Sequence, residues 1–178
     1  MTTPAKIVRE VSAGGVVLRR IRDRWHVAII EPNTINADKV TRRASSRPEG
    51  TVFALPKGAV DHGETPEHTA AREVWEETGV RAEIISKLTD IKYFYVRSWG
   101  GRERVFKIVS FYLFRYASGR LGNIRPEMRV EVRRAFWLPL EEAAAKLTYK
   151  GEKQVVALAQ KYVREHMEKA SHQPRGHE

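Results

Sequence analysis

One segment, Gly58 to Val80, constrains the fold of this chain more than any other; it reads GAVDHGETPEHTAAREVWEETGV. Within it, Thr65 precedes Pro66. A hydroxyl residue followed by proline is typical of a helix start, because the hydroxyl can cap a free backbone N–H and the fixed φ of proline suits the first helical turn. Gly79 is suited to the position after the last helical turn, where the backbone often adopts a left-handed conformation. The segment therefore predicts a glycine-containing turn followed by one short helix.

The expected helix carries acids on one side. Glu73, Glu76 and Glu77 are three and four positions apart, so at about 100° per residue they fall within an arc of roughly 100°. Ala70 and Val74 project to another side and are expected to pack on a sheet. Three carboxylates on one face repel one another, at a cost of about 0.2–0.5 kcal/mol for each pair. Another group must offset this repulsion.

The charge of this segment is opposite to that of the rest of the chain. It holds six acids and one basic residue in a chain of net charge +10, so the segment carries −5 and the remaining residues carry +15. A surplus of positive charge points to polyanions, which include nucleic acid, phosphate-rich small molecules and acidic membrane surfaces. Charge alone does not choose among these partners.

Two different partners can offset the repulsion among the carboxylates. Arg72 lies beside Glu76 on the helix surface, and pairing between them would give a solvated helix with ion pairs. The other partner is a hard divalent cation, because oxygen ligands suit Mg²⁺ or Mn²⁺. The chain has no cysteine, and only His62 and His68 lie near the acids, which argues against zinc. Gly58 would let a backbone carbonyl approach such an ion.

The spacing of these residues resembles the signature of the Nudix hydrolases. SAGGVV at 12–17 is similar to the first strand of that family, and WLPLEEAAAKL at 137–147 is similar to its late strand-to-helix segment. The resemblance covers about Val11 to Tyr162. It implies an α/β chain of the α+β type, with a mixed β-sheet sandwiched between helices and a catalytic strand-loop-helix. The matching signature positions are Gly58, Glu64, Arg72, Glu73, Val74, Glu76, Glu77, Gly79 and Val80.

The resemblance also implies roles for the acids. Mg²⁺ is the expected ion, with Mn²⁺ as a substitute. Arg72 is expected to orient Glu73, and Glu64 is expected to support the ligands from outside. The expected catalytic residues are Arg72, Glu73 and Glu76, and the expected metal ligands are Gly58 through its carbonyl, Glu73, Glu76, Glu77 and Glu131.

The last of these ligands comes from a distant loop, as in many members of the family. Glu131, six residues before Trp137, is the expected acid, and Glu127 is its alternative. Relatives often carry another acid three residues before that tryptophan, where this chain has Arg134. The number of metal ions therefore stays open.

The implied activity is hydrolysis of a phosphoanhydride by water. LPKG at 55–58 resembles members that act on dinucleoside polyphosphates and also some that act on oxidised nucleoside triphosphates. A long polyphosphate would use the surplus of positive charge outside the acidic segment, so a substrate such as Ap4A to Ap6A is the first expectation. Alternatives are an (oxidised) nucleoside triphosphate pyrophosphatase of the MutT type and a 5′-pyrophosphohydrolase of RNA. From another class, a non-catalytic module of this fold would bind nucleic acid through its charge.

Candidate substrate-binding residues lie outside the acidic helix. Lys57 would place a positive charge beside the phosphates, although a solvent-facing turn residue is the alternative. Aromatic faces can stack on bases. The expected set is Lys57, Arg43, Arg97, Arg104 and Tyr95.

The length of 178 residues fits one domain, expected over 1–170 with an Arg-rich loop at 32–51 and a disordered tail at 171–178. No apolar run is long enough to span a membrane, and no secretory signal is evident. A cytoplasmic protein is expected, as a monomer or homodimer.

Hydrophobic alternation predicts the remaining elements. A hairpin is expected from VSAGGVVLRR and RWHVAII, and a buried strand from TVFALPKG. AEIISKL, IKYFYVRS, RVFKIVSFYLFRYA and RAFWLPL are expected strands, with a turn at WGGR. PLEEAAAKL and the stretch from Gly151 to Ala170 are expected helices.

Overall fold

The computed structural model describes residues 7–33, 50–97 and 103–168. Within these ranges the chain forms strands and helices of an α+β fold. They are β1 (Ile7–Ile21), β2 (Arg24–Pro32), β3 (Lys57–Ala59), α2 (Pro66–Thr78), β4 (Val80–Arg97), β5 (Glu103–Gly119), the 3-10 turn η1 (Pro126–Val130), β6 (Val132–Pro139), α3 (Leu140–Lys146), α4 (Lys150–Tyr162) and the π-helical turn η2 (Val163–Met167).

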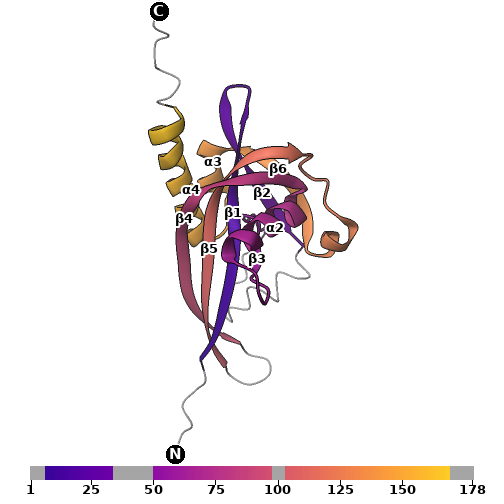
Figure 1. Cartoon of the computed structure of the whole chain (residues 1–178), viewed down its shortest axis with the longest axis vertical. Helices are drawn as coiled ribbons and strands as arrows, with labels where there is room; N and C mark the ends of the chain where they lie inside the picture. Colours follow the sequence, from indigo (N-terminus) through magenta and orange to yellow (C-terminus); the bar gives the residue numbers. More distant parts are fainter. Residues whose placement is uncertain (1–6, 34–49, 98–102, 169–178) are drawn as a thin grey trace, which may run out of the picture.

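The strands form one mixed sheet in the order β4-β5-β1-β2-β6, with β3 paired to β1 off this path. β1 and β5 are parallel, whereas the other strand pairs are antiparallel. β4, β5 and β1 lie side by side, and they extend together to the lower end of the molecule in Figure 1. The mixed sheet expected from the sequence is therefore present.

The expected hairpin joins β1 to β2. Its turn residues, Arg22 and Asp23, have φ of 46° and 62°, the left-handed conformation required by a two-residue turn between twisted strands. Leu18 pairs with Val27 at the start of the ladder and Ile21 with Arg24 at its end.

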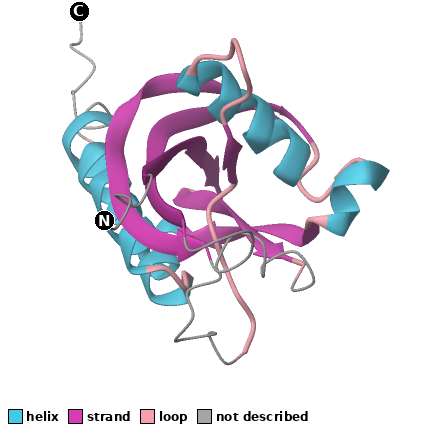
Figure 2. Ribbon diagram, turned by 90° about the horizontal axis from the view of Figure 1, so that it is seen from below, coloured by secondary structure: helices cyan, strands magenta, loops and turns pink. Residues whose placement is uncertain are grey.

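Helices cover both faces of the sheet. Alternation along β1 sends Val16 and Leu18 to the core under α3 and α4, and Val17 to the core under α2. Seen from below, the strands form a strongly curved sheet with helices at separate sides of it (Figure 2). The sequence-based expectation of a sheet sandwiched between helices is met by these two cores.

Two strand predictions were wrong in their bounds. TVFALPKG does not form a continuous strand: Ala54 makes an isolated bridge to Ile30, and the strand proper is only Lys57–Ala59. Pro56 has no N–H to continue a ladder, which explains the interruption. AEIISKL and IKYFYVRS are one strand, β4. It has three register shifts against β5, and the last of them, between Lys87 and Thr89, lies where the two predicted strands meet.

Other predictions fall outside the described residues. These are most of the Arg-rich loop at 32–51, the WGGR turn and the tail at 171–178. In the ranges that are described, no helix combines the length and apolar character needed to cross a bilayer.

Candidate active site

Helix α2 begins and ends as its sequence predicts. Thr65 is the N-cap, and its hydroxyl accepts a hydrogen bond from the backbone N–H of His68 at 3.3 Å. Gly79 ends the helix with φ of 80°, and its N–H donates to the carbonyl of Trp75 at 2.8 Å. The buried residues of the helix include both apolar side chains and two glutamates, Glu73 and Glu77. The acids therefore face the protein rather than solvent.

Arg72 holds three of the acids together. Its Nε and Nη2 donate to the two carboxylate oxygens of Glu64, each at 2.9 Å. Its Nη1 donates to Glu73 Oε1 at 2.8 Å and to Glu76 Oε2 at 3.0 Å. The planar guanidinium thus fixes the positions of Glu73 and Glu76 relative to the turn that carries Glu64.

Glu64 is itself fixed from two sides. Besides Arg72, the hydroxyl of Thr69 donates to Glu64 Oε2 at 2.7 Å. These hydrogen bonds lower the pKa of Glu64 to about 2, and the one from Arg72 has a larger effect than the one from Thr69. Arg72 Nη2 also donates to the carbonyl of Ala59 at 3.2 Å, so the guanidinium joins β3 to α2.

Gly58 lies directly against the acids. A β-carbon at Gly58 would sit 2.1 Å from Glu73 Oε1 and 2.2 Å from its carboxyl carbon, so only glycine fits this position. On the adjacent residue, the backbone N–H of Lys57 donates to Glu77 Oε2 at 2.8 Å. β3 and α2 are therefore joined through two carboxylates.

Burial changes the proton affinity of both carboxylates. It raises the pKa of Glu73 to about 7, against the opposing effect of Arg72, with Glu76 and Glu131 contributing in the same direction as burial. It raises the pKa of Glu77 to about 8, against Lys57, with Glu73 and Glu131 again adding to the rise. Two carboxylates with raised pKa values at one place in the fold are typical of a functional site.

The negative charge of Glu131 adds a small contribution to the raised pKa of both buried glutamates, Glu73 and Glu77. It follows η1 and caps it, and its carbonyl accepts from the N–H of Asn33 at 2.7 Å. Its alternative, Glu127, is exposed and paired with Arg125. Glu131 therefore stays the proposed acid from outside α2.

Arg134, the departure from the family pattern, has another partner. Its Nε donates to Glu31 Oε2 at 2.5 Å, and Arg133 donates to Glu31 Oε1 at 3.0 Å. The side chain of Glu31 is only 6% exposed. The arginine therefore neutralises a buried acid on the neighbouring strand β2.

Lys57 joins the two faces of the sheet. Its N–H binds Glu77 of α2, whereas its ammonium lies 2.8 Å from Glu152 Oε1 of α4. Burial would lower the pKa of Lys57, but the ion pair with Glu152 outweighs it, so the pKa of Lys57 is raised. The side chain is 22% exposed. Lys57 is thus neither a free surface lysine nor one paired with the acidic side chains of α2.

The other substrate-binding candidates are not brought together. The hydroxyl of Tyr95 donates to Glu10 Oε2 at 2.7 Å. Arg104, which is exposed, pairs in register with Val96, so alternation places Arg104 and Tyr95 on opposite faces of the β4–β5 ladder. Arg97 ends β4, but its side chain is not described, and Arg43 lies outside the described residues.

Three α2 carboxylates retain oxygen atoms for a metal ion. Among the described residues, no three His, Asp or Glu side chains form a ready-made ligand cluster. However, Arg72 and the N–H of Lys57 engage only one oxygen each of Glu73, Glu76 and Glu77. The remaining oxygens and the glycine backbone beside them form an oxygen-only donor set, which fits Mg²⁺ or Mn²⁺.

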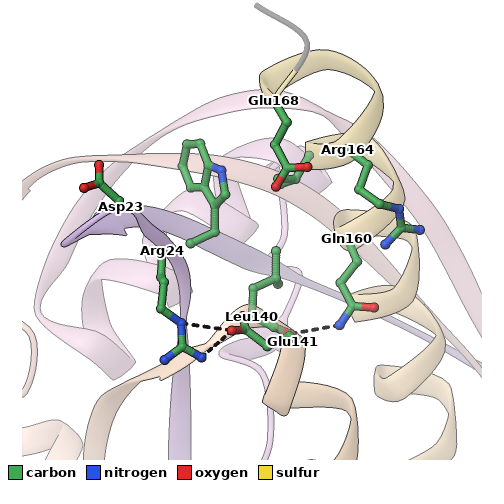
Figure 3. A pocket seen from close by; sticks show the side chains of 9 residues that line it. Asp23, Arg24, Leu140, Glu141, Gln160, Arg164 and Glu168 are labelled. Atoms are coloured by element: carbon green, nitrogen blue, oxygen red, sulfur yellow. Dashed lines mark hydrogen bonds and ion pairs between the residues drawn. The ribbon is translucent and has the colours of Figure 1, made fainter. Parts of the chain in front are cut away.

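A separate open pocket of about 530 Å³ lies between the β1–β2 turn and the ends of α3 and α4 (Figure 3). Some of its polar groups are paired with one another: Arg24 Nε donates to Glu141 at 3.0 Å, and Gln160 donates to the carbonyl of Leu140 at 2.9 Å. None of the predicted site residues lines it. We therefore place the candidate active site at β3 and α2.

Sequence reasoning missed Glu152. From the sequence, Glu152 was expected only to be one residue near the start of a helix. In the structure it is buried on the same side of α4 as Val155, Val156 and Ala159, which follow it at helical spacing. An acid at such a position must have a partner, because an unpaired buried charge is costly. That signal would have identified Glu152 as a residue with a buried cation opposite.

Comparison with known proteins shows the family of this chain. The sequence profile of the NUDIX domain matches residues 24–159. A protein of Mycobacterium tuberculosis named putative mutator protein MutT4 is 35% identical over 165 residues, which make up 91% of this chain and 59% of that protein. The 8-oxo-(d)GTP phosphatase of Mycolicibacterium smegmatis is 30% identical over 154 residues, 86% of this chain and 42% of that protein. This chain thus spans only about half the length of these two relatives.

The fold also matches solved structures. A binary complex of Ap4A hydrolase from C. elegans superimposes with a TM-score of 0.61 at 20% sequence identity, covering 88% of this chain and 98% of that one. At this identity the likeness concerns the fold alone. It confirms the fold expected from the sequence.

Proposed function

Since this chain belongs to the Nudix hydrolase family, as its sequence predicted, we propose that it is a metal-dependent hydrolase that cleaves a phosphoanhydride bond of a nucleotide substrate. The observation that carries the proposal is the contact of Gly58 with the carboxylate of Glu73, beside Glu77 and under the guanidinium of Arg72. Three glutamates lie on α2, and within the described residues each has one oxygen that accepts no hydrogen bond from Arg72 or Lys57.

Each part of the site has a task in this reaction. A phosphoanhydride is shielded by its anionic oxygens, so catalysis consists mainly of neutralising charge and aligning water with the phosphorus. The proposed ligands are Glu73, Glu76, Glu77, Glu131 and the carbonyl of Gly58. A bound Mg²⁺ would polarise the phosphate oxygens and lower the pKa of a water molecule.

The remaining steps belong to the chain itself. A carboxylate of the α2 cluster accepts the proton of the attacking water. Arg72 keeps Glu73 and Glu76 at a fixed separation while this happens, because its other two nitrogens are anchored on Glu64. Lys57, next to Gly58, places positive charge for the phosphates that are not attacked.

Two substrate classes have support. A dinucleoside polyphosphate is our first expectation, because LPKG precedes the acidic segment and the rest of the chain carries surplus positive charge. The Ap4A hydrolase of C. elegans shares the fold. An oxidised nucleoside triphosphate is the second, since relatives named MutT4 and 8-oxo-(d)GTP phosphatase match most of this chain.

A substrate panel tests the proposal. The panel compares dinucleoside tetra- to hexaphosphates, canonical and 8-oxo nucleoside triphosphates, nucleotide sugars and triphosphorylated RNA, with Mg²⁺ and with Mn²⁺. Glu73→Gln and Glu77→Gln should each lower kcat by about 10²- to 10⁴-fold, with the fold retained. Glu83→Gln, at an exposed acid of β4, is the matched control. Unchanged turnover in both site variants would exclude this mechanism.

The same panel separates an enzyme from a binding module. A non-catalytic module would bind RNA in a salt-sensitive manner and without a metal ion. An enzyme would show turnover that depends on the metal ion and stops with a chelator.

A further inference from the structure

One buried carboxylate on α4 holds the chain immediately before Gly58. Glu152 lies in the first turn of α4, and its side chain is 4% exposed. Its Oε2 accepts from the N–H of Leu55 at 2.9 Å, and its Oε1 lies 2.8 Å from the ammonium of Lys57. The carboxylate therefore binds both the backbone and a side chain of the segment that leads to the acids of α2.

The same segment is also held from the other side. The carbonyl of Pro56 accepts from the N–H of Gly15 at 3.1 Å, and the N–H of Lys57 donates to Glu77 at 2.8 Å. Each residue from Leu55 to Lys57 thus has a defined partner on β1, α2 or α4. The position of Gly58 depends on α4 as well as on α2.

The start of α4 packs closely enough against the rest of the fold to hold this segment in position. A β-carbon at Gly151 would lie 2.8 Å from Ile91 Cδ1, so the helix approaches β4 as closely as its backbone allows. Just before the helix, the hydroxyl of Thr148 accepts from the N–H of Phe53 at 2.9 Å, and the N–H of Thr148 donates to the carbonyl of Phe53 at 3.0 Å. Thr148 and Glu152 therefore hold the segment 53–57 at Phe53, Leu55 and Lys57.

We propose that Glu152 is a positioning residue for the reaction: it holds the ammonium of Lys57 in place for the substrate phosphates and, through Leu55, sets the backbone that presents the Gly58 carbonyl. This inference rests on the proposed function. A purely structural role, in which the buried ion pair only keeps α4 on the sheet, is the alternative that the experiment must separate.

Three substitutions separate the two tasks of Glu152. Glu152→Gln keeps an oxygen for the N–H of Leu55 but removes the charge opposite Lys57, whereas Glu152→Ala removes both. Lys57→Gln removes only the ammonium. The double variant Lys57→Gln/Glu152→Gln completes a cycle, and Glu142→Gln, an exposed acid on α3 paired with Arg24, is the control.

The kinetic measurements are kcat and KM with Mg²⁺ and the best substrate of the panel. Glu152→Gln should raise KM about tenfold or more with a smaller change in kcat, and this effect should vanish when Lys57 is already Gln. Unchanged KM in Glu152→Gln, or effects that simply add in the double variant, would overturn the role through Lys57.

A second measurement needs no turnover. Mn²⁺ alone is titrated into each protein and the free ion is followed by electron paramagnetic resonance. Glu152→Gln should bind Mn²⁺ like the wild type, whereas Glu152→Ala should bind about tenfold more weakly, because the Gly58 carbonyl loses its support. Equal Mn²⁺ affinity in folded Glu152→Ala would overturn the role through Leu55.

Thermal unfolding completes the design. A purely structural residue would lower Tm while leaving KM and the Mn²⁺ affinity of the folded protein unchanged, and that pattern contradicts the proposal. If wild type and Glu142→Gln show no turnover of any substrate, the proposed function fails, whereas the Mn²⁺ titrations still decide whether Glu152 positions the loop.

Discussion

The α-carbon of Gly58 lies so close to the carboxylate of Glu73 that an added β-carbon would be only 2.1 Å from Oε1. This contact joins a residue of strand β3 to a residue of helix α2. The position of the Glu73 carboxylate therefore depends on the absence of a side chain at Gly58.

Gly58→Ala should therefore disable the site with little effect on the rest of the fold. The methyl group must displace the carboxylate of Glu73, so we expect Mn²⁺ affinity and kcat each to fall about tenfold or more. Gly63→Ala is the matched control, because a β-carbon there meets no atom within 4 Å and only the strain at φ of 86° remains. A Gly58→Ala variant with normal Mn²⁺ affinity would contradict the prediction.

The raised pKa values predict how the metal-free protein responds to pH. Glu73 and Glu77 have pKa values of about 7 and about 8, against an ordinary value of 4.5. Between about pH 4.5 and 8 the folded protein therefore binds more protons than the unfolded chain, so the free energy of unfolding falls as the pH rises. Glu64, with its lowered pKa, acts in the opposite direction, but only below about pH 4.5.

Urea unfolding in a chelator, repeated across this pH window, measures the effect. Glu77→Gln should flatten the fall relative to wild type. Mn²⁺ should restore stability most at the top of the window, where the carboxylates bind it without losing a proton. Parallel pH curves for wild type and Glu77→Gln would show that burial of Glu77 does not control this response.

Glu64 offers a test of Arg72 as an orienting residue. Glu64→Gln cannot form the charged, two-point contact with the guanidinium, so Glu73 and Glu76 lose their fixed separation. We expect kcat to fall about tenfold or more, although the enzyme can still be saturated with substrate. Asp61→Asn is the control, since Asp61 lies 3.6 Å from Arg72 and is 72% exposed. Equal kcat values for the two variants would oppose this role.

Arg134→Glu tests the departure from the family pattern. The change restores an acid that relatives often carry, but here it faces the buried Glu31, whose remaining partner would be Arg133. We expect a loss of about 1–3 kcal/mol in the free energy of unfolding, measured by urea denaturation. Arg129→Glu, at another arginine just before β6, should change it by less than about 0.5 kcal/mol. Comparable losses in both variants would mean that Glu31 tolerates a like charge.

Local rules explain why the acidic helix could be predicted from the sequence. A cap hydroxyl, a proline and a terminal glycine act within a few residues, and the face shared by Glu73, Glu76 and Glu77 follows from helical spacing alone. The alternative in which Arg72 simply pairs the acids was half right. Arg72 does pair with Glu73 and Glu76, yet it leaves one oxygen of each without a partner in the described part of the chain.

Long-range pairing explains what the sequence did not provide. Glu152 and Lys57 are 95 positions apart in the sequence. No sequence feature near either residue indicates that the other is its partner. Likewise, alternation along β4 and β5 separates Arg104 from Tyr95, although both lie near one hairpin. Charge and aromatic content identified candidates, but only the sheet register decides which of them share a face.

The parallel pairing of β1 with β5 has a consequence for biosynthesis. Ile7 pairs with Arg104 and Leu18 pairs with Arg115. The central strand β1 therefore gains its second neighbour only after β5 has been synthesised. Until β5 has left the ribosome, the nascent chain exposes an unpaired edge of its first strand, and such an edge can pair with another chain.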